Sequence, residues 1–305
     1  MEAVVANNLV KYYKTGKQIV NAVKSISFSV KKRELFGIIG PDGAGKTSLF
    51  RMLTTLLLPD GGTATVDGSD IVKQYKIIRN RVGYMPGRFS LYQDLTVEEN
   101  LQFFATIFNT TVQENYDLIK GIYIQIEPFK NRKAGKLSGG MKQKLALSCA
   151  LIHRPVVLFL DEPTTGVDAV SRKEFWEMLQ DLKQQGITIL VSTPYMDEAA
   201  LCDRVLLMQE GNTLSIGTPK EITNSFSQTL IAVKSEAMYQ LLKDLPQWKE
   251  IEDSYSFGEY HHAVMKEGFN EDAFRKFLED KGHKNLEMHS VQPNIEDCFL
   301  HLMKQ

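Results

Sequence analysis

The sequence has few cysteines, no long apolar run and almost no net charge. Its three cysteines lie far apart with no CxxC spacing, which argues against a disulfide framework or a zinc site and favours a reducing compartment. The 36 lysines and arginines nearly balance the 37 aspartates and glutamates, leaving a formal charge of -1. No strong field therefore attracts nucleic acid or acidic lipid, so any phosphate chemistry must be local.

Features of a membrane-spanning chain are also missing. No run of about 18 apolar residues occurs, and the start, MEAVVANNLVKYY, shows no basic head followed by an apolar core. We expect that the chain itself does not cross a membrane. This does not exclude a partner that is embedded in the membrane. With 305 residues, 43% of them hydrophobic, the chain can bury a large core and favours two domains over one or three.

Short apolar runs alternate with helical periodicity through the first two-thirds of the chain. This pattern is typical of a mainly parallel α/β sheet. The runs that most strongly predict strands, each ending in or near glycine, hydroxyl or acidic residues, are 34–40, 156–162, 187–193 and 204–211.

Two further segments, residues 4–13 and 24–30, predict half-buried strands joined by a turn around Thr15 and Gly16. We expect them to form an antiparallel layer beside the parallel one, and residues 63–68 could join it.

A helical stretch covers roughly residues 95–135. Thr96 can cap its first helix, since Glu99 lies three residues later in a capping-box pattern. We interpret this stretch as part of an inserted helical subdomain at about residues 88–150.

After residues 217–226 the pattern changes to a β-α-β-β-α-β order with one more helix, which predicts a small ferredoxin-like domain. We therefore place the domains at residues 1–220 and 221–305. On one predicted strand of the second domain, His261 and His262 face opposite sides, so they cannot easily share one metal ion, and we interpret both as solvated.

A phosphate-binding loop is the strongest single motif. The segment GPDGAGKTS follows a predicted strand, opens an apolar helix and matches G-x-x-x-x-G-K-[ST]. Glycines let successive amides turn inward around an anion, and the helix adds its positive end. Lys46 would reach the outer phosphates and the Thr47 hydroxyl would ligate magnesium. The predicted nucleotide-binding residues here are Gly40, Pro41, Asp42, Gly43, Ala44, Gly45, Lys46, Thr47 and Ser48.

Two adjacent acids end the predicted strand 156–162. Asp161 and Glu162 would point to opposite faces unless the strand ends between them. Asp161 suits a place near magnesium, and Glu162 suits a base or a positioner for the attacking water. The alternative is that both acids cap a turn, which Pro163 would favour.

A second anion site is predicted within KLSGGMKQKLALSCALIHRP, residues 136–155. Ser138, Gly139 and Gly140 open a helix there, and their amides and hydroxyl can bind an anion. Taken alone, the segment is better explained as an ordinary Ser-capped helix, but beside the phosphate loop and the paired acids it is the most specific signal in the chain.

The order of these elements across residues 1 to about 220 resembles the nucleotide-binding subunits of ABC transporters. GPDGAGKT looks like Walker A, LSGGMKQ like the signature, VVLFLDEP like Walker B and TGVDAVSR like the D-loop. The general shape of the chain is similar to the drug- and multidrug-type export subunits. The resemblance implies a P-loop NTPase cassette of α/β class, with a mixed sheet, an antiparallel layer and a helical subdomain, followed by a small α+β ferredoxin-like domain.

In that family two subunits face head to tail, and each ATP lies between one chain's phosphate loop and the other chain's signature. This implies that Ser138, Gly139 and Gly140 act on a partner's nucleotide. Leu137 of the signature and Asp168 of the D-loop are also predicted to bind nucleotide.

The resemblance also assigns two aromatic regions. Tyr13 sits where the family keeps an aromatic that stacks on adenine; Tyr12 is a rival, and a core tyrosine is the alternative for either. Residues 83–101 resemble the loop that touches the membrane subunit. Apolar area for that contact, or else for the core, would come from Tyr84, Met85, Phe89, Leu91 and Tyr92.

The chain departs from the family at two positions. Gly87 stands where the family has a glutamine that contacts magnesium and water, and Pro194 stands where it has a histidine that contacts the terminal phosphate. Neither glycine nor proline offers a side-chain donor. We expect a site that binds MgATP but hydrolyses it slowly. The alternative is that Glu162 alone positions the water and hydrolysis is normal.

The resemblance implies a transport-coupled ATPase that uses ATP and Mg2+ and lies in the cytoplasm, peripheral on the inner face of the cell membrane. Its implied partners are a separate transmembrane permease and a second nucleotide-binding subunit, identical or, as we favour, different. Export is favoured and import stays open. We expect no nucleic-acid partner; the alternative is a soluble ABC-type switch on ribosomes or DNA, against which stand the single cassette and the lack of heptads or a basic patch.

Overall fold

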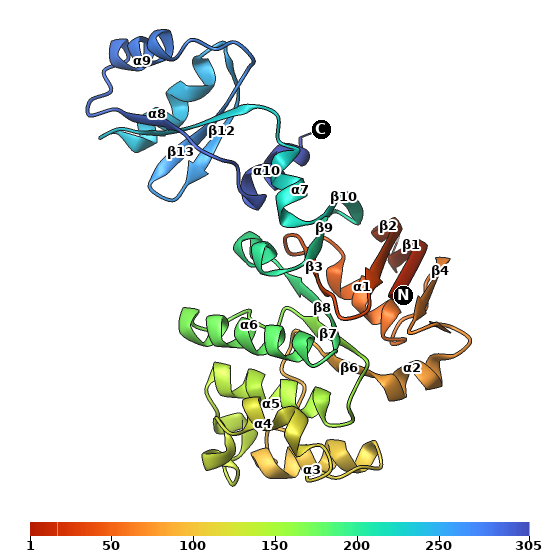
Figure 1. Ribbon diagram of the computed structural model, residues 1–305. Helices are drawn as coiled ribbons and strands as arrows, with labels where there is room; N and C mark the ends of the chain where they lie inside the picture. Colours follow the sequence, from red (N-terminus) through yellow and green to blue (C-terminus); the bar gives the residue numbers. More distant parts are fainter. Residues whose placement is uncertain (17, 305) are drawn as a thin grey trace. The chain divides into compact units, whose positions relative to one another are not determined.

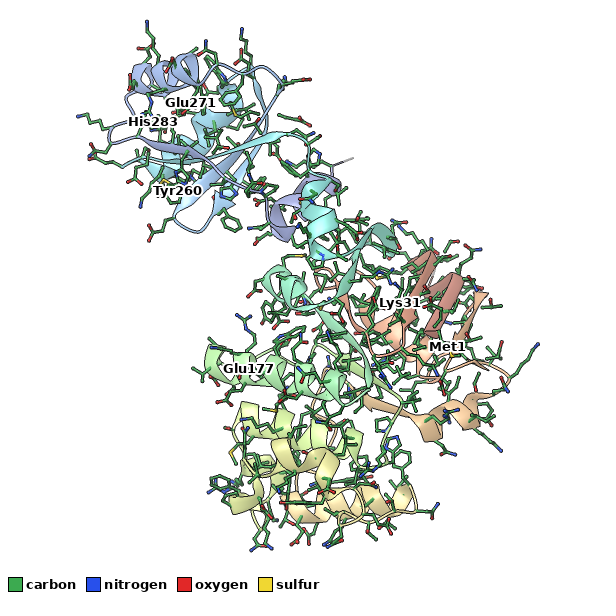
Figure 2. The ribbon with its side chains drawn as sticks, viewed as in Figure 1. Met1, Lys31, Glu177, Tyr260, Glu271 and His283 are labelled. Carbon is green, nitrogen blue, oxygen red and sulfur yellow. The ribbon has the colours of Figure 1, made fainter. Side chains whose placement is uncertain are left out.

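A computed structural model describes residues 1–16 and 18–304 and divides the chain into two units (Figure 1). Unit 1 contains Met1–Pro219 and the residues from Leu302 onward, whereas unit 2 contains Lys220–His301. Figure 2 shows the side chains of both units. Within the described residues, no helix has both the length and the apolar character that crossing a bilayer requires.

Unit 1 has an antiparallel sheet in the order β2-β1-β4-β5. The register of β1 and β2 runs from Glu2 opposite Lys31 to Thr15 opposite Gln18, and β4 pairs with the other edge of β1. The predicted antiparallel layer is therefore confirmed, and of the segment 63–68 residues 63–66 belong to it. Its strands are β1 (Glu2–Thr15), β2 (Gln18–Lys31), β4 (Gly61–Val66) and β5 (Ser69–Asp70).

The central sheet of unit 1 has the order β10-β9-β3-β8-β7-β6. Its neighbouring strands are parallel except for the pair β9 and β10. Every residue of β3, β7 and β8 is buried, as expected for continuous apolar strands covered on both faces. The strands are β3 (Leu35–Ile39), β6 (Val82–Met85), β7 (Val157–Asp161), β8 (Thr188–Thr193), β9 (Arg204–Gln209) and β10 (Asn212–Gly217).

Helix α1 (Lys46–Leu53) lies between the two sheets, in contact with β2, β4 and β7. Its Phe50 ring meets Phe159 edge to face at 5.6 Å, and both side chains are fully buried. This packing holds the start of α1 next to the carboxyl end of β3. The remaining helices of this part are α2 (Tyr75–Arg81), α6 (Ala169–Gln184) and the 3-10 helix η3 (Met196–Leu201).

The helical part of unit 1 begins with the predicted capping box. Thr96 Oγ1 accepts from the Glu99 amide, and the Glu99 carboxylate accepts from the Thr96 amide. This exchange satisfies two amides that the first turn would leave unpaired. The helices are α3 (Val97–Ile107), α4 (Tyr116–Tyr123), η1 (Glu127–Phe129), η2 (Ala134–Lys136) and α5 (Gly139–Leu151).

Unit 2 has an antiparallel sheet in the order β12-β13-β11-β14. Two of its helices connect the strands in the β-α-β-β-α-β succession, which gives the ferredoxin-like arrangement expected from the sequence. The elements are α7 (Pro219–Asn224), β11 (Thr229–Lys234), α8 (Met238–Asp244), η4 (Leu245–Gln247), β12 (Ile251–Phe257), β13 (Tyr260–Met265), α9 (Glu271–Asp280), β14 (Glu287–Ser290) and α10 (Ile295–Leu302).

The interpretation of the two histidines as solvated is wrong. His261 and His262 are 5% and 6% exposed on β13. His261 Nε2 lies 2.8 Å from the Met238 carbonyl of α8, whereas His262 Nδ1 lies 2.7 Å from the Asp297 carboxylate of α10. The two rings point to opposite sides of this central strand. Both are nevertheless buried, because helices cover both of its faces.

Candidate functional site

The phosphate-binding loop connects the end of β3 to the start of α1. Gly43 and Gly45 adopt φ angles of 81° and 104°, which side-chain-bearing residues rarely adopt. A Cβ at Gly45 would lie 2.0 Å from the Ala22 carbonyl oxygen, and one at Gly40 would lie 2.1 Å from that of Met208. Local packing therefore requires glycine at positions 40 and 45, whereas at position 43 only the backbone conformation favours it.

Lys46 lies inside this loop with only 3% of its surface exposed. Its ammonium group donates to the carbonyls of Gly40 at 2.7 Å and Pro41 at 3.0 Å. The same group lies 3.1 Å from the Glu162 carboxylate. A preformed cation thus stands at the amino end of α1, where the helix also favours negative charge.

The two acids are separated by a sharp backbone turn. Strand β7 ends at Asp161, and Glu162 has a φ of 50° in the left-handed region. Ser192 of the neighbouring strand holds both: its hydroxyl donates to Asp161 at 2.6 Å, and its hydroxyl and carbonyl oxygens accept from the Glu162 amide at 3.1 and 3.0 Å. The structure therefore aims Glu162 at Lys46, and it adds Ser192, which the sequence reasoning missed.

Thr47 and Glu162 border two cavities next to the loop. One, of about 170 Å³, is lined by the loop residues Gly43 to Ser48 and Ala22, and the other, of about 490 Å³, also contains Asp161 and Gly87. Arg51 and Arg88 line the larger cavity, and the sequence reasoning did not single out either of these cations.

Tyr84 also lines the larger cavity. Burial, reinforced by the negative charge of Asp161, raises the pKa of Tyr84 to about 12, so its hydroxyl keeps its proton at neutral pH.

Thr47 and Asp161 meet the chemical requirements of a magnesium site. Mg2+ prefers oxygen ligands and commonly takes few from the protein. The Thr47 hydroxyl and the Asp161 carboxylate line the same cavity, and Asp161 is 2% exposed with Ser192 orienting one of its oxygens. This donor set fits the ion predicted from the sequence.

Gly87 and Pro194, the two positions where we expected departures, lie at the same edge of the sheet. A Cβ on Gly87 would lie 3.0 Å from the Asp161 carbonyl oxygen and 3.7 Å from Glu162 Cβ, so position 87 faces the acids directly. Pro194 follows the last residue of β8, Thr193, whose carbonyl accepts from the Gly40 amide at 3.2 Å. Neither position carries a polar side chain near the acids or the loop.

The segments that we expected to be the signature and the D-loop lie together at the starts of two helices. Ser138 caps α5 by accepting from the Met141 amide at 3.4 Å, while Asp168 caps α6 by accepting from the Ser171 amide at 3.0 Å. That backbone hydrogen bond, helped by the Ser171 hydroxyl, lowers the pKa of Asp168. A Cβ on Gly140 would lie 2.7 Å from Ser171 Oγ. None of these residues lines the two cavities beside the chain's own phosphate loop, as far as the described residues show.

Tyr13 and Tyr12 are 37% and 38% exposed, so neither is a core residue. The hydroxyl of Tyr13 lies 3.1 Å from that of Ser48, which ties this ring, and not the Tyr12 ring, to the phosphate loop. The Lys11 ammonium lies 5.8 Å from the Tyr13 ring centroid.

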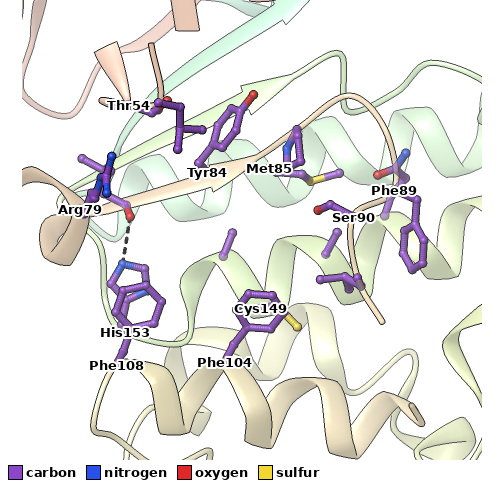
Figure 3. Close-up of a pocket in the computed structure, with 17 residues that line it drawn as sticks. Thr54, Arg79, Tyr84, Met85, Phe89, Ser90, Phe104, Phe108, Cys149 and His153 are labelled. Atoms are coloured by element: carbon purple, nitrogen blue, oxygen red, sulfur yellow. Dashed lines mark hydrogen bonds between the residues drawn. The ribbon is translucent and has the colours of Figure 1, made fainter. Parts of the chain in front are cut away.

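An apolar groove of about 200 Å³ runs between β6 and the helical part (Figure 3). Tyr84, Met85, Phe89 and Leu91 line it, as do Phe104 and Phe108, whereas Tyr92 is 51% exposed and lies outside the lining. His153 stacks on Phe108 at 3.7 Å and bonds the Val82 carbonyl at 3.0 Å, the dashed contact in Figure 3.

Known proteins resemble this chain over most of its length. Residues 23–165 match the protein-family model described as ABC transporter. The chain is 39% identical over 286 residues to the probable multidrug ABC transporter ATP-binding protein YbhF of Escherichia coli, a match that covers 92% of this chain and 49% of that protein. This chain thus spans about half the length of that relative.

Two further relatives match over more of their own length. The linearmycin resistance ATP-binding protein LnrL of Bacillus subtilis is 32% identical over 311 residues, covering 97% of both chains. The Nod factor export ATP-binding protein I of Burkholderia lata is 41% identical over 206 residues, covering 67% of this chain and 68% of that protein.

Among solved structures, a dimeric ATP-binding cassette in a post-hydrolysis state, bound to ADP and Pi, matches with a TM-score of 0.64 and 25% identity. That match covers 70% of this chain and 98% of the other.

Proposed function

Because this chain belongs to the ABC transporter family of ATPases, in its export-type ATP-binding branch, we propose that it binds MgATP between two cassettes and drives a separate transmembrane permease. The observation that carries the proposal is the buried Lys46 ammonium, held between two loop carbonyls and Glu162 at the start of α1. The Lys46 ammonium, the amides of the phosphate loop and the amino end of α1 all lie at this place, and together they can bind the negative charge of a triphosphate.

Each residue of the loop and its neighbours then has a distinct task. Lys46 exchanges carbonyl and carboxylate oxygens for those of the outer phosphates. Thr47 and Asp161 hold Mg2+, which when bound supplies positive charge to those phosphates. Glu162 orients the attacking water and accepts its proton. The exposed Tyr13 ring beside Ser48 stacks on the adenine.

The signature and D-loop act on the nucleotide of the facing subunit. Ser138, Gly139 and Gly140 open α5 with a capped, accessible amino end, and Asp168 opens α6 next to it. Their position away from this chain's own cavities supports a role across a subunit interface.

Hydrolysis at the chain's own site is slow in this proposal. Gly87 lies against both acids without a side chain, and Pro194 leaves the turn after β8 without a donor. Removing one preorganised polar contact from an active site costs about 10²- to 10³-fold in rate. We therefore favour a partner cassette of different sequence, which would receive an intact signature from this chain.

The apolar groove supports a docking surface for the permease. Met85 and Leu91 are 3% and 8% exposed, so they belong to the core that forms the groove wall, and the apolar area open to a partner comes from half-buried side chains such as Phe89. A permease helix seated there would place the chain on the inner face of the membrane, from which it would drive export.

Titration calorimetry with MgATP tests the binding site. We expect binding that is roughly 10- to 100-fold weaker in Lys46→Ala, and absence of heat with the native chain would refute the site. Phosphate release by the purified chain, alone and then mixed with a candidate partner cassette, tests the pairing. Rapid turnover of the chain alone, abolished by Glu162→Gln, would contradict the need for a different partner.

A further inference from the structure

A second charged cleft lies at the opposite end of the central sheet from the phosphate loop. It has a volume of about 350 Å³ and borders the first residues of β7 and β8, Val157 and Thr188. The loop follows the last residue of β3 instead, so a five-residue strand, roughly 15 Å long, separates the two regions. At the rim of the cleft, the backbone amide of Lys32 donates to the Met1 carbonyl at 3.1 Å.

Four cations and one acid line this cleft. The cations are Lys32, Arg33, Arg81 and Arg154, and the acid is Asp67. Asp67 lies 3.2 Å from the Lys32 ammonium and 2.5 Å from the Arg81 guanidinium. One carboxylate thus forms ion pairs with two cations. The local formal charge is positive, although the net charge of the chain is -1.

The negative ends of nearby helices neutralise only part of this positive charge. Helices α2, α5 and α6 all end near the cleft, and each carboxyl end carries roughly half a negative charge. Together with Asp67 they offset roughly 2.5 of the four positive charges, which leaves an excess of roughly 1.5. An unneutralised excess in a concave site attracts an anion.

Two of the arginines have guanidinium groups available for a ligand. The Arg33 guanidinium makes no hydrogen bond or ion pair to any residue that the structure describes. Arg154 donates through Nε to Asn115 Oδ1 at 2.6 Å, which orients the group and leaves its two terminal amino groups without an acceptor among residues 1–16 and 18–304. Planar guanidinium groups match phosphate oxygens in pairs.

We propose that this cleft binds a phosphate group, and that its source is the headgroup of an anionic lipid. The choice of source rests on the proposed function. Arg79 and His153 line the apolar groove assigned to the permease, whereas Arg81 and Arg154, close by in sequence, line the cleft. A chain docked through that groove would hold the cleft near the membrane surface. A free phosphate compound has the same chemistry and is the other source that the experiment separates.

Vesicle co-sedimentation tests the proposal on the full chain. We expect binding to vesicles that contain phosphatidylglycerol and none to vesicles of phosphatidylcholine alone. The variant carrying Lys32→Gln and Arg33→Gln should bind about 30-fold more weakly, since each cation near an anionic surface contributes about fivefold. Arg33→Lys, which keeps the charge, should retain most of the binding.

A matched control removes two charges elsewhere. Lys249→Gln with Lys276→Gln takes the same charge from exposed positions of unit 2 and should bind vesicles as the native chain does. The unfolding midpoint of each variant shows whether it is folded. Equal vesicle binding by the cleft variant and this control would overturn the proposal, as would absence of binding by the native chain to both anionic vesicles and inorganic phosphate.

Titration with inorganic phosphate separates the two sources. Heat that disappears in the cleft variant and remains in the control variant, together with no binding of the native chain to anionic vesicles, would assign the cleft to a free phosphate compound. Vesicle binding without such heat would assign it to lipid. The Lys46→Ala variant distinguishes this proposal from the nucleotide site. It should bind MgATP more weakly and bind vesicles as the native chain does, whereas the cleft variant should bind vesicles more weakly and MgATP as the native chain does.

Discussion

Replacing Gly87 by glutamine is expected to raise the rate of ATP hydrolysis by the chain's own site. A Cβ at this position would lie 3.7 Å from Glu162 Cβ and on the wall of the larger cavity beside Thr47 and Asp161. A glutamine amide extends roughly 3.5 Å beyond Cβ, far enough to reach the space between these groups. One restored polar contact corresponds to about 100-fold in kcat, the lower end of its usual range because Pro194 is still present.

The same substitution should also lower the stability of the protein, and a second variant separates this loss from the gain in hydrolysis rate. The new Cβ would lie 3.0 Å from the Asp161 carbonyl oxygen, a few tenths of an ångström closer than an ordinary contact. Relieving such overpacking costs about 1 kcal/mol of unfolding free energy. Gly87→Ala introduces the same contact without the amide. It should therefore lose the same stability and gain no activity.

The assay is phosphate release at saturating MgATP, measured at protein concentrations where specific activity no longer changes, so that subunit association is not limiting. Adding Pro194→His to Gly87→Gln should raise kcat again. The reasoning is refuted if Gly87→Gln binds MgATP with unchanged affinity and is no faster than the native chain, or if Gly87→Ala is accelerated to the same extent.

Three further outcomes follow from the geometry. Lys46→Ala removes the cation 2.7 Å from the Gly40 carbonyl and should weaken MgATP binding by roughly 10- to 100-fold in calorimetry. An unchanged affinity would show that the triphosphate binds elsewhere. Gly140→Val brings a side chain within 2.7 Å of Ser171 Oγ, so it should separate the starts of α5 and α6 and abolish hydrolysis in the assembled pair while this chain still binds ATP, which binding and turnover assays together can check. Asp297→Asn should lower the unfolding free energy by about 1–3 kcal/mol at pH 7. Burial raises the pKa of Asp297, but hydrogen bonds led by His262 outweigh it and lower the pKa overall. The carboxylate's contribution is therefore complete above the unfolded pKa of about 3.9 and is lost as the pH falls through the lower folded pKa. Denaturant titrations should show the deficit shrinking below pH 4, and a constant deficit would show that the charge of Asp297 does not matter.

Local sequence signals predicted most of the frame that positions the site. Buried strands such as 187–193 were recognisable because their apolar runs end at loops with distinctive residues, and the structure has β8 at Thr188–Thr193. The Thr96 and Glu99 exchange was predictable because a capping box depends on residues three apart. Both signals lie within a few neighbouring residues.

Features that depend on strand register could not be predicted from the sequence. Ser192 reaches Asp161 and Glu162 only because β7 and β8 pair with Asp161 opposite Ser192. The positive φ of Glu162 arises at the same place.

The buried state of His262 likewise depends on Asp297 of α10 covering its face of the sheet, 35 residues away along the chain. Alternation along one strand predicts which face of the sheet a side chain points to. It does not predict which other element of the chain covers that face.

The arrangement of Lys46 has a consequence for the entropy of ligand binding. A free lysine side chain retains about 2 kcal/mol of rotameric freedom, and a receptor that orders such a chain on contact loses affinity by that amount. Here the carbonyls of Gly40 and Pro41 and the Glu162 carboxylate have already fixed the ammonium during folding. The nucleotide therefore meets an ordered cation, and its affinity reflects the exchange of one set of oxygens for another.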